Sequence, residues 1–243
     1  MRDAMNQEDS VSMQTDQDVV DRIIRARHTR KVMLSPERRE EASIAWSAEH
    51  EQALRTMIEG AAWAPFHRRA HEETHRQGSL DSVVPWRFHV LDKTACLALL
   101  DYLQVQMESN TDPRWARAWQ SKIKNMLSAC GALVQATWLP DPADEAGELQ
   151  LTDNNVEHIA AAGAAIQNLL LAAEARRWRS YWSSGGILRD AQVFEYLGIG
   201  ASESLLGSLF LTPEEADGAT LIHGGLRDQR GDTGSWSRWV QLP

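Results

Sequence analysis

The longest apolar segment of the chain, residues 154–178, reads NNVEHIAAAGAAIQNLLLAAEARRW. Its middle consists almost entirely of Ala, Gly, Ile and Leu, so a helix over these residues is apolar around most of its perimeter. Small side chains also let neighbouring elements approach closely. We expect a helix capped by Asn154 or Asn155 and buried on most sides, packed against other elements or a partner subunit.

A chain of 243 residues, 43% of them hydrophobic, suits one or at most two globular domains with a sizeable core. The formal net charge of −9 argues against general binding to nucleic acid or to a membrane surface. No segment has the roughly 18 uninterrupted apolar residues of a membrane span, and residues 1–18 read as a polar tail without the apolar region of a signal peptide. We expect a soluble, cytoplasmic protein with a single domain over residues 19–243.

Helical and strand patterns alternate along the chain without a strict rhythm. Helices are predicted over residues 19–26, 47–64, 93–107, 113–130, 154–178 and 189–199, and strands over residues 85–91, 131–140, 180–186 and 203–212. Residues 234–243 read as a terminal strand or arm. This irregular alternation favours a mixed α+β fold over a doubly wound sheet.

The sequence RIIRARHTRK, residues 22–31, concentrates basic residues in an acidic protein. Such a cluster at the end of a helix is either a solvated face or an anion site. Arginine supplies forked donors, lysine a point charge and threonine a hydroxyl, a combination that suits a phosphate monoester.

The sequence WSSGG, residues 182–186, follows a predicted strand. Its glycines allow backbone N–H groups to approach a planar or anionic ligand. A turn before the next helix explains the same residues equally well.

The sequence HEETH, residues 71–75, fits the H-E-x-x-H pattern of zinc hydrolases, with His67 one helical turn earlier. However, Ala70 is the only apolar residue nearby, and the flanking arginines would repel a cation. We therefore expect a polar loop and no metal. A zinc-dependent hydrolase using His71, Glu72 and His75 remains an alternative hypothesis.

Several motifs occur in an order that resembles one known family. RARHTRK (25–31) is followed by EGAAWAP (59–65), PWRFHVL (85–91), EHIAAAGAAIQNLLLAAEARRWRSYW (157–182) and LGIGASESLLGSLFLTP (197–213). Together they resemble the nitroreductase family of FMN-dependent oxidoreductases, over the chain from about Val19 to its end.

The resemblance implies an α+β sandwich around a central, mainly antiparallel sheet, and an intertwined homodimer with FMN at two interface sites. It also implies ping-pong reduction of a small-molecule acceptor, such as a nitroaromatic or quinone, with electrons from NADH or NADPH. The cofactor would carry the chemistry, so no catalytic side chain is expected. The alternative is a flavoprotein of the same fold that oxidises or otherwise transforms a specialised, possibly anionic, metabolite.

By motif position, the resemblance implies which residues contact FMN. The phosphate and ribityl contacts would be Arg27, His28, Thr29, Lys31 and Arg230; the contacts near ring atom N5 would be Ser183, Ser184, Gly185 and Gly186; Pro65 and Trp86 would flank the ring, with Asn125 or Lys122 at its pyrimidine edge.

The sequence departs from the family pattern between residues 66 and 84. Phe66 stands where the family has a small serine, and a polar insertion follows it, near the expected pocket. This insertion would form a cationic rim that selects the substrate, made of Phe66, His67, Arg68, His71 and His75.

Overall fold

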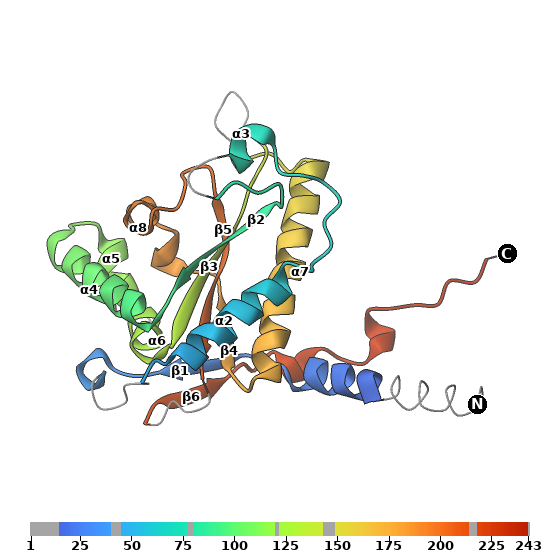
Figure 1. Ribbon diagram of the computed structural model, residues 1–243, viewed down its shortest axis with the longest axis horizontal. Coiled ribbons are helices and arrows are strands. Elements are labelled where there is room, and N and C mark those ends of the chain that lie inside the picture. The colour runs from blue at the N-terminus through green and yellow to red at the C-terminus, as the bar shows by residue number, and fades with distance from the viewer. Residues whose placement is uncertain are drawn as a thin grey trace.

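The computed structural model describes residues 15–39, 45–76, 80–119, 122–142, 149–213 and 218–242. A four-stranded antiparallel sheet lies at its centre, with helices on both faces (Figure 1). The strand order is β2 (Trp86–Leu91), β3 (Ala132–Trp138), β5 (Ser204–Thr212) and β4 (Arg179–Ser183). The mixed α+β fold with an antiparallel central sheet, expected from the sequence, is confirmed.

The side chains of β3 alternate between two hydrophobic clusters, as the two-residue period of a strand requires. Val134 packs in the cluster under α2 (Ala48–Ala61) and α7 (Asp153–Ala175). Leu133 packs in the cluster on the opposite face. That face is covered by α4 (Lys93–Ser109), α5 (Pro113–Trp119), α6 (Ile123–Ala129) and α8 (Ala191–Leu197).

Several helix boundaries differ from the sequence-based expectation. The helix expected from Val19 begins earlier, because residues 15–18 are already helical. These four residues were expected to belong to the polar tail. The single helix expected over residues 113–130 is divided into α5 and α6. The cap of α7 is Thr152, whose Oγ1 accepts the Asn155 N–H at 3.1 Å, because the helix begins one residue before the expected caps.

Helix α7 is long and apolar enough, by length and composition alone, to cross a membrane. In this structure, one face of it packs on the sheet and on α2. The other face is not covered within the chain: Val156 is exposed, and Gly163 has no atom within 4 Å of the place of a Cβ. Among the described residues, the helix is therefore covered on one side; burial of its other side against a partner subunit stays a prediction.

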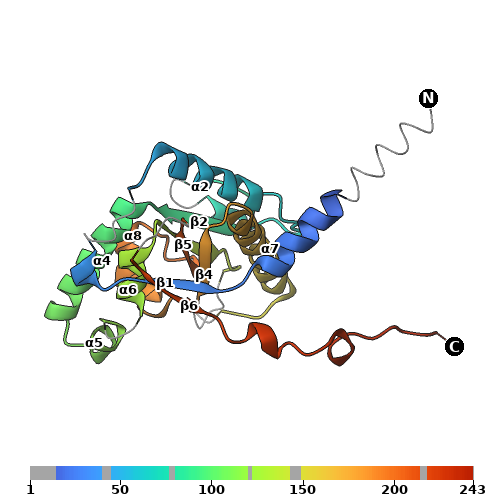
Figure 2. The same cartoon turned by 90° about the horizontal axis from the view of Figure 1, so that it is seen from below.

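A second, two-stranded sheet was not predicted. It pairs β1 (Arg30–Met33) with β6 (Thr220–His223) in antiparallel register, Arg30 opposite His223. Figure 2 shows this ribbon beneath the central sheet. The ribbon thus connects a segment near the start of the described chain to a segment near its end.

Two segments project from the same side of the molecule in both Figure 1 and Figure 2. They are the helix over residues 15–26 and the C-terminal arm, residues 224–242. Both carry exposed apolar side chains, including Ile24 on the helix and Trp239, which is 99% exposed, on the arm. The expected terminal arm is thus confirmed, without a strand among its described residues.

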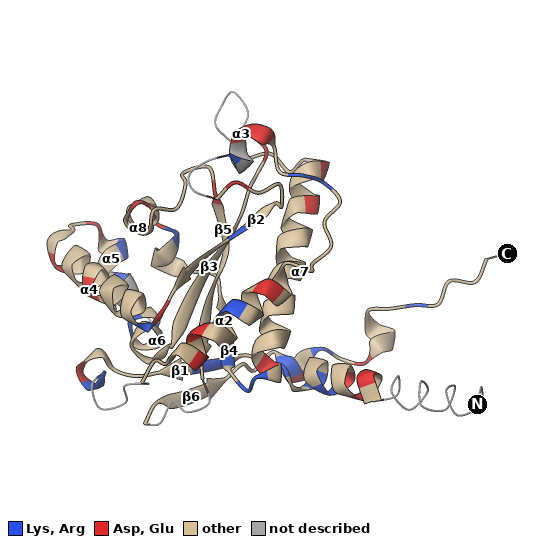
Figure 3. Cartoon of the chain, viewed as in Figure 1, with Lys and Arg blue, Asp and Glu red and all other residues tan. Residues whose placement is uncertain are grey.

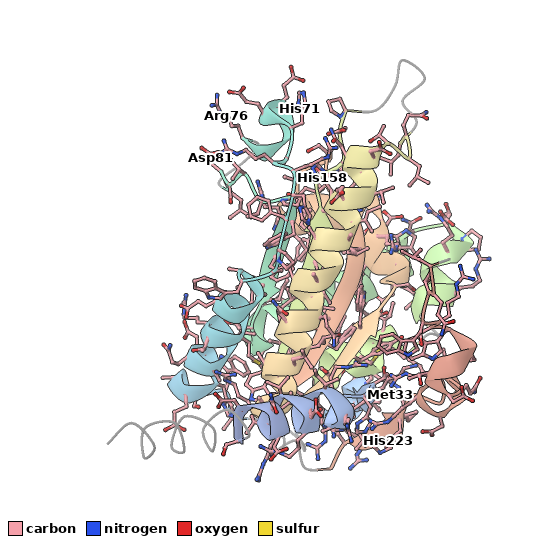
Figure 4. The ribbon with its side chains drawn as sticks, turned by 90° about the vertical axis from the view of Figure 1, so that its right-hand side faces the viewer. Met33, His71, Arg76, Asp81, His158 and His223 are labelled. Atoms are coloured by element: carbon pink, nitrogen blue, oxygen red, sulfur yellow. The ribbon has the colours of Figure 1, made fainter. Side chains whose placement is uncertain are left out.

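The described part of the polar insertion, residues 66–84, lies at the opposite end of the molecule from the ribbon. It contains α3 (Glu72–His75), and it is tied back by the buried Ala70, whose N–H donates to the Val83 carbonyl at 2.9 Å. Figure 4 shows His71 at one end of the molecule and His223 at the other. Residues 77–79 and the side chain of His75 lie outside what the structure describes.

A buried ion pair connects β2 to the residue before β5. His89 Nε2 lies 2.7 Å from Glu203 Oε2, which also accepts the Thr137 hydroxyl proton. Burial opposes ionisation of Glu203, but the hydrogen bonds from His89 and Thr137 outweigh it and hold the pKa of Glu203 below its ordinary value.

This lowered pKa predicts acid-sensitive stability. A carboxyl whose folded-state pKa is depressed stabilises the fold above its ordinary value of about 4.5, and the stabilisation is lost as pH falls through the folded pKa. We expect Glu203→Gln to flatten the decline in unfolding free energy as pH falls below the ordinary carboxyl value of about 4.5, measured by urea denaturation. Glu51→Gln, at an exposed carboxyl paired with Arg55, should leave the decline unchanged. Parallel pH profiles for wild type and Glu203→Gln would contradict the prediction.

Candidate functional site

The ribbon of β1 and β6 borders a cavity of about 450 Å³. Such a volume lies within the range of small-molecule and cofactor pockets. The residues lining it are Arg27, His28, Thr29, Lys31, Tyr181, Trp182, Gly224, Gly225, Leu226, Arg227 and Arg230. The structure therefore brings together all five residues expected at the phosphate end.

Strand pairing explains why two segments two hundred residues apart meet here. The register of β1 and β6 places Gly224 beside Thr29, and the Gly224 N–H donates to the Thr29 carbonyl at 3.0 Å. A Cβ at Gly224 would lie 2.8 Å from the Thr29 Cβ, so only glycine permits this approach. The ribbon thus holds the loop after the N-terminal helix against the loop that carries Arg227 and Arg230.

Three arginines converge on the cavity. Arg227 is fixed by donating to the carbonyls of Arg25 and Ala26, at the end of the helix over residues 15–26. Burial, followed by the neighbouring charge of Arg230, lowers the pKa of Arg27, and Arg227 contributes in the same direction. Figure 3 shows Lys and Arg gathered around this end of the molecule. Positive charges held this close repel one another, and a bound anion would relieve that repulsion.

An ion pair behind the cavity holds β1 on α7. Arg30 binds Glu174 through two nitrogen–oxygen contacts of 3.0 and 3.2 Å, and the two side chains are 20% and 10% exposed. The Arg30 Nε also lies 3.1 Å from His28 Nε2. Since His28 Nδ1 lies 2.7 Å from the Ala26 carbonyl, the proton belongs on Nδ1 and Nε2 accepts. His28 therefore lines the cavity with its acceptor nitrogen already engaged, while its ring stacks on His223 at 5.2 Å.

Aromatic side chains from β4 form another wall of the cavity. The Lys31 Nζ lies 4.6 Å above the centre of the Tyr181 ring, a cation–π contact that positions the ammonium group. The neighbouring Trp182 lines the same cavity and directs its indole N–H toward the Leu206 carbonyl at 3.4 Å. Aromatic rings and cationic side chains thus line the same cavity.

The residues expected near the flavin ring follow directly along the chain. Ser183 is buried, and its hydroxyl accepts the Gly185 N–H at 3.2 Å. Gly185 and Gly186 have φ of 95° and 55°, in the region that favours glycine. This turn leads away from the aromatic wall into the short 3₁₀ helix Gly186–Arg189.

A second cavity of about 340 Å³ opens at the end of this turn. It is lined by Arg114, Arg117, Gly186, Ile187, Arg189 and Asp190. Nothing in the sequence motifs indicated this arrangement, because α5 comes close to the turn only in the folded chain.

The remaining expected site residues lie outside both cavities. The Asn125 carbonyl accepts the Leu34 N–H just after β1, and its buried side-chain Oδ1 has no hydrogen-bond partner among the described residues. Trp86 is buried, with Phe66 edge-on at 5.8 Å, and Pro65 is exposed. None of Phe66, His67, Arg68 and His71 lines the cavities of the same chain.

The described residues also bear on the zinc hypothesis. They contain no group of three or more His, Cys, Asp or Glu side chains close enough to hold an ion. The two labelled histidines near the insertion, His71 and His158, come from the loop and from α7 (Figure 4).

No protein-family model and no curated protein matches the chain. Solved structures do match. A nitroreductase-like family protein from Bacillus cereus is 20% identical, with a TM-score of 0.60 over 92% of this chain and 96% of the other. A nitroreductase with bound FMN from Bacteroides fragilis is 18% identical, with a TM-score of 0.56 over 91% and 98%. A nitroreductase from Lactococcus lactis in complex with nicotinic acid is 15% identical, with a TM-score of 0.54 over 91% and 98%.

The fold and the cavity together define a class of protein. It is an α+β sandwich with a central antiparallel sheet and a cavity lined by cationic and aromatic side chains. More particularly, the chain has the nitroreductase fold, over almost its whole length.

Sequence reasoning did not find Arg227, Tyr181 or Trp182 as cavity residues. Arg227 could have been found, because it stands three residues before Arg230 and so shares a face with it in a helical turn. The aromatic wall could have been found only by pairing β4 in the sheet.

Proposed function

We propose that this protein is an FMN-dependent oxidoreductase. The observation that carries the proposal is the convergence of Arg27, Arg227 and Arg230 on one cavity whose other wall is formed by Tyr181 and Trp182. Clustered guanidinium groups suit a phosphate monoester, and an aromatic wall suits a planar ring system. FMN combines these two groups in one molecule.

The residues present fit this cofactor. The three arginines and Lys31 offer charge and hydrogen-bond donors for the phosphate, and the glycine turn at Gly185 comes three residues after Trp182 of the cavity lining. The buried Asn125 Oδ1 has no hydrogen-bond donor among the described residues, so it is available to accept a hydrogen bond from a ring N–H. The bound FMN of the Bacteroides fragilis nitroreductase supports the same assignment.

When bound, FMN supplies hydride transfer between a nicotinamide donor and an acceptor. The chain binds the phosphate through its arginines, holds β1 in place through the ion pair of Arg30 and Glu174, and keeps backbone close at the turn. We propose NADH or NADPH as the donor and a planar compound, such as a nitroaromatic or quinone, as the acceptor. The nicotinic acid complex of the Lactococcus lactis nitroreductase supports a planar ligand.

The test is to reconstitute the purified protein with FMN and titrate it anaerobically with NADH and with NADPH, following visible absorbance. We expect a yellow protein that one of the two nicotinamides bleaches. A protein that stays colourless after incubation with FMN would overturn the proposal. Bound flavin that neither nicotinamide reduces would instead favour the alternative, a flavoprotein of the same fold that transforms another metabolite.

We further propose a homodimer. The uncovered face of α7 presents Val156, Ala160 and Gly163. The projecting helix and the C-terminal arm also expose apolar side chains on one side of the molecule. Contiguous exposed apolar surface of this kind marks a protein interface.

The dimer predicts an effect of charge on α7. Gly163→Arg should produce a monomer in sedimentation velocity, because it places an unpaired charge in the middle of an apolar interface. Val105→Arg is the matched control: it adds the same charge at an exposed valine of α4, on the other side of the sheet, and should leave the dimer intact. A wild-type protein that sediments as a monomer would contradict the proposal.

A further inference from the structure

The second cavity adjoins the proposed flavin turn. Gly186 lines it, and Arg189 donates through Nε to the carbonyl of Ser184 within that turn. Trp182 of the first cavity and Gly186 of the second are four residues apart, a separation of at most roughly 14 Å along the chain. The two cavities are therefore neighbouring compartments along one stretch of backbone.

Three arginines and one carboxylate, Asp190, line the second cavity, so its lining carries a net positive charge. Arg114 takes both nearby carboxylates: its Nε lies 2.6 Å from Asp112, and its guanidinium lies 3.5 Å from Asp190. Asp190 is further engaged, because it caps α8 by accepting the Gln192 N–H at 3.0 Å. Among the residues that the structure describes, Arg117 and Arg189 have no carboxylate in ion-pair contact. The charge of Arg117 nevertheless contributes, after the hydrogen bonds from Arg114, to lowering the pKa of Asp112.

Two guanidinium groups on one small cavity form a receptor for an oxyanion. Each presents a planar fork of N–H donors, and a carboxylate has the matching two oxygens. The volume of about 340 Å³ lies at the lower end of ligand pockets, which limits the occupant to a small molecule.

We propose that Arg117 and Arg189 bind the carboxylate of the acceptor, and that the protein prefers small planar acids. This rests on the proposed function, because the flavin is what the acceptor must face. The carboxylate would sit in the second cavity, and the conjugated part of the acceptor would lie over the turn Ser183–Gly186. Arg117 and Arg189 would therefore select anionic acceptors within one chain. The insertion, which is distant in the same chain, does not provide this selection.

The first measurement is binding without turnover. Benzoate and benzamide have the same ring and differ in charge, so calorimetric titration of the FMN-loaded protein isolates the carboxylate. We expect benzoate to bind at least about tenfold more tightly than benzamide, the advantage of a charge-assisted hydrogen bond. Arg117→Gln and Arg189→Gln should each remove most of that difference. Both arginines are exposed, so neither change disturbs the core.

The second measurement is turnover of a matched pair, 4-nitrobenzoate and its methyl ester, with the nicotinamide that bleaches the flavin. In each case one nicotinamide gives a hydride, the medium gives a proton, and the nitro group becomes a nitroso group with release of water. We expect the ratio of kcat/KM for the acid over the ester to fall about tenfold to a hundredfold in either variant. Arg117→Lys should recover part of the ratio, and Arg55→Gln, an exposed arginine on α2, should not change it.

The outcomes separate this inference from the function on which it rests. Equal binding of benzoate and benzamide, or an acid-to-ester ratio that both variants leave unchanged, would overturn the carboxylate site while the reductase stands. Loss of FMN from the wild-type protein would overturn both. A salt-sensitive preference that Arg55→Gln lowers as much as Arg117→Gln would show general surface charge, and would also overturn the site.

Discussion

Arg27→Gln is expected to raise the Kd for FMN by roughly tenfold to a hundredfold, as measured by quenching of flavin fluorescence. A charge-assisted hydrogen bond contributes about 1.5–3 kcal/mol, and each 1.4 kcal/mol is a factor of about ten in Kd. Riboflavin lacks the phosphate, so its Kd should change by less than about twofold. The difference between the two ligands therefore assigns the effect to the phosphate, and not to the ring.

Two controls sharpen this prediction. Arg25→Gln removes an arginine that is two residues away, exposed, and paired only with Asp21 at 3.4 Å, so it should leave FMN binding unchanged. In the absence of FMN, Arg27→Gln should not lower the unfolding free energy, since it removes one of several mutually repelling charges. Equal weakening of FMN and riboflavin, or a destabilised apoprotein, would place Arg27 in a structural role.

Gly185→Ala is expected to have the largest effect on stability. Gly185 has φ of 95° and ψ of −37°, a conformation that costs an L-residue about 1–3 kcal/mol. The added Cβ would also lie 2.5 Å from Leu205 Cδ2, and Leu205 is buried against Phe194 and Ile199. We expect the unfolding free energy to fall by about 2–4 kcal/mol in urea denaturation, and FMN binding to weaken with it, because the turn must shift.

Gly198→Ala separates the two causes. Gly198 has φ of 67° and ψ of 26°, a left-handed conformation that alanine adopts at a cost of about 1–2 kcal/mol. No atom lies within 4 Å of its Cβ position, so no collision is added. Equal destabilisation by the two substitutions would mean that the contact with Leu205 is unimportant. An unchanged FMN affinity in Gly185→Ala would remove the turn from the proposed site.

The elements that were predicted well are those whose signals are local. Ser47 caps α2 by accepting the His50 N–H, and His50 Nδ1 accepts the Ser47 N–H in return. The strands β2, β3 and β5 are rich in apolar residues on one or both faces of the sheet. The predicted bounds of each strand lie within a few residues of the observed bounds. A cap and a periodicity depend on neighbours within one or two turns, so a single sequence contains them.

The elements that were missed depend on distant partners. β1 and β6 are four residues each, partly exposed, and they stabilise each other across almost two hundred residues. Neither has an apolar period of its own to reveal it. The division between α5 and α6 has no Gly or Pro signal either.

The candidate site likewise contains residues that local sequence patterns predict and features that depend on the fold. The basic cluster and Arg230 could be assigned from motif order, because the chemistry of a phosphate restricts the residues that can bind it. The place of the insertion could not be assigned in this way. Within one chain, His71 lies at the opposite end of the molecule from His223 (Figure 4), so the expected substrate rim stays a prediction.

The sequence by itself determined the class of fold, the long apolar helix and the set of residues suited to hold a phosphate, because these follow from local periodicity and side-chain chemistry. Only the tertiary structure decided which residues meet. Pairing of β1 with β6 places Arg227 beside Arg27, and packing of α5 on the turn after β4 brings Arg117 and Arg189 to one cavity. Contacts between residues far apart in the chain are set by strand register and core packing, which no single segment specifies.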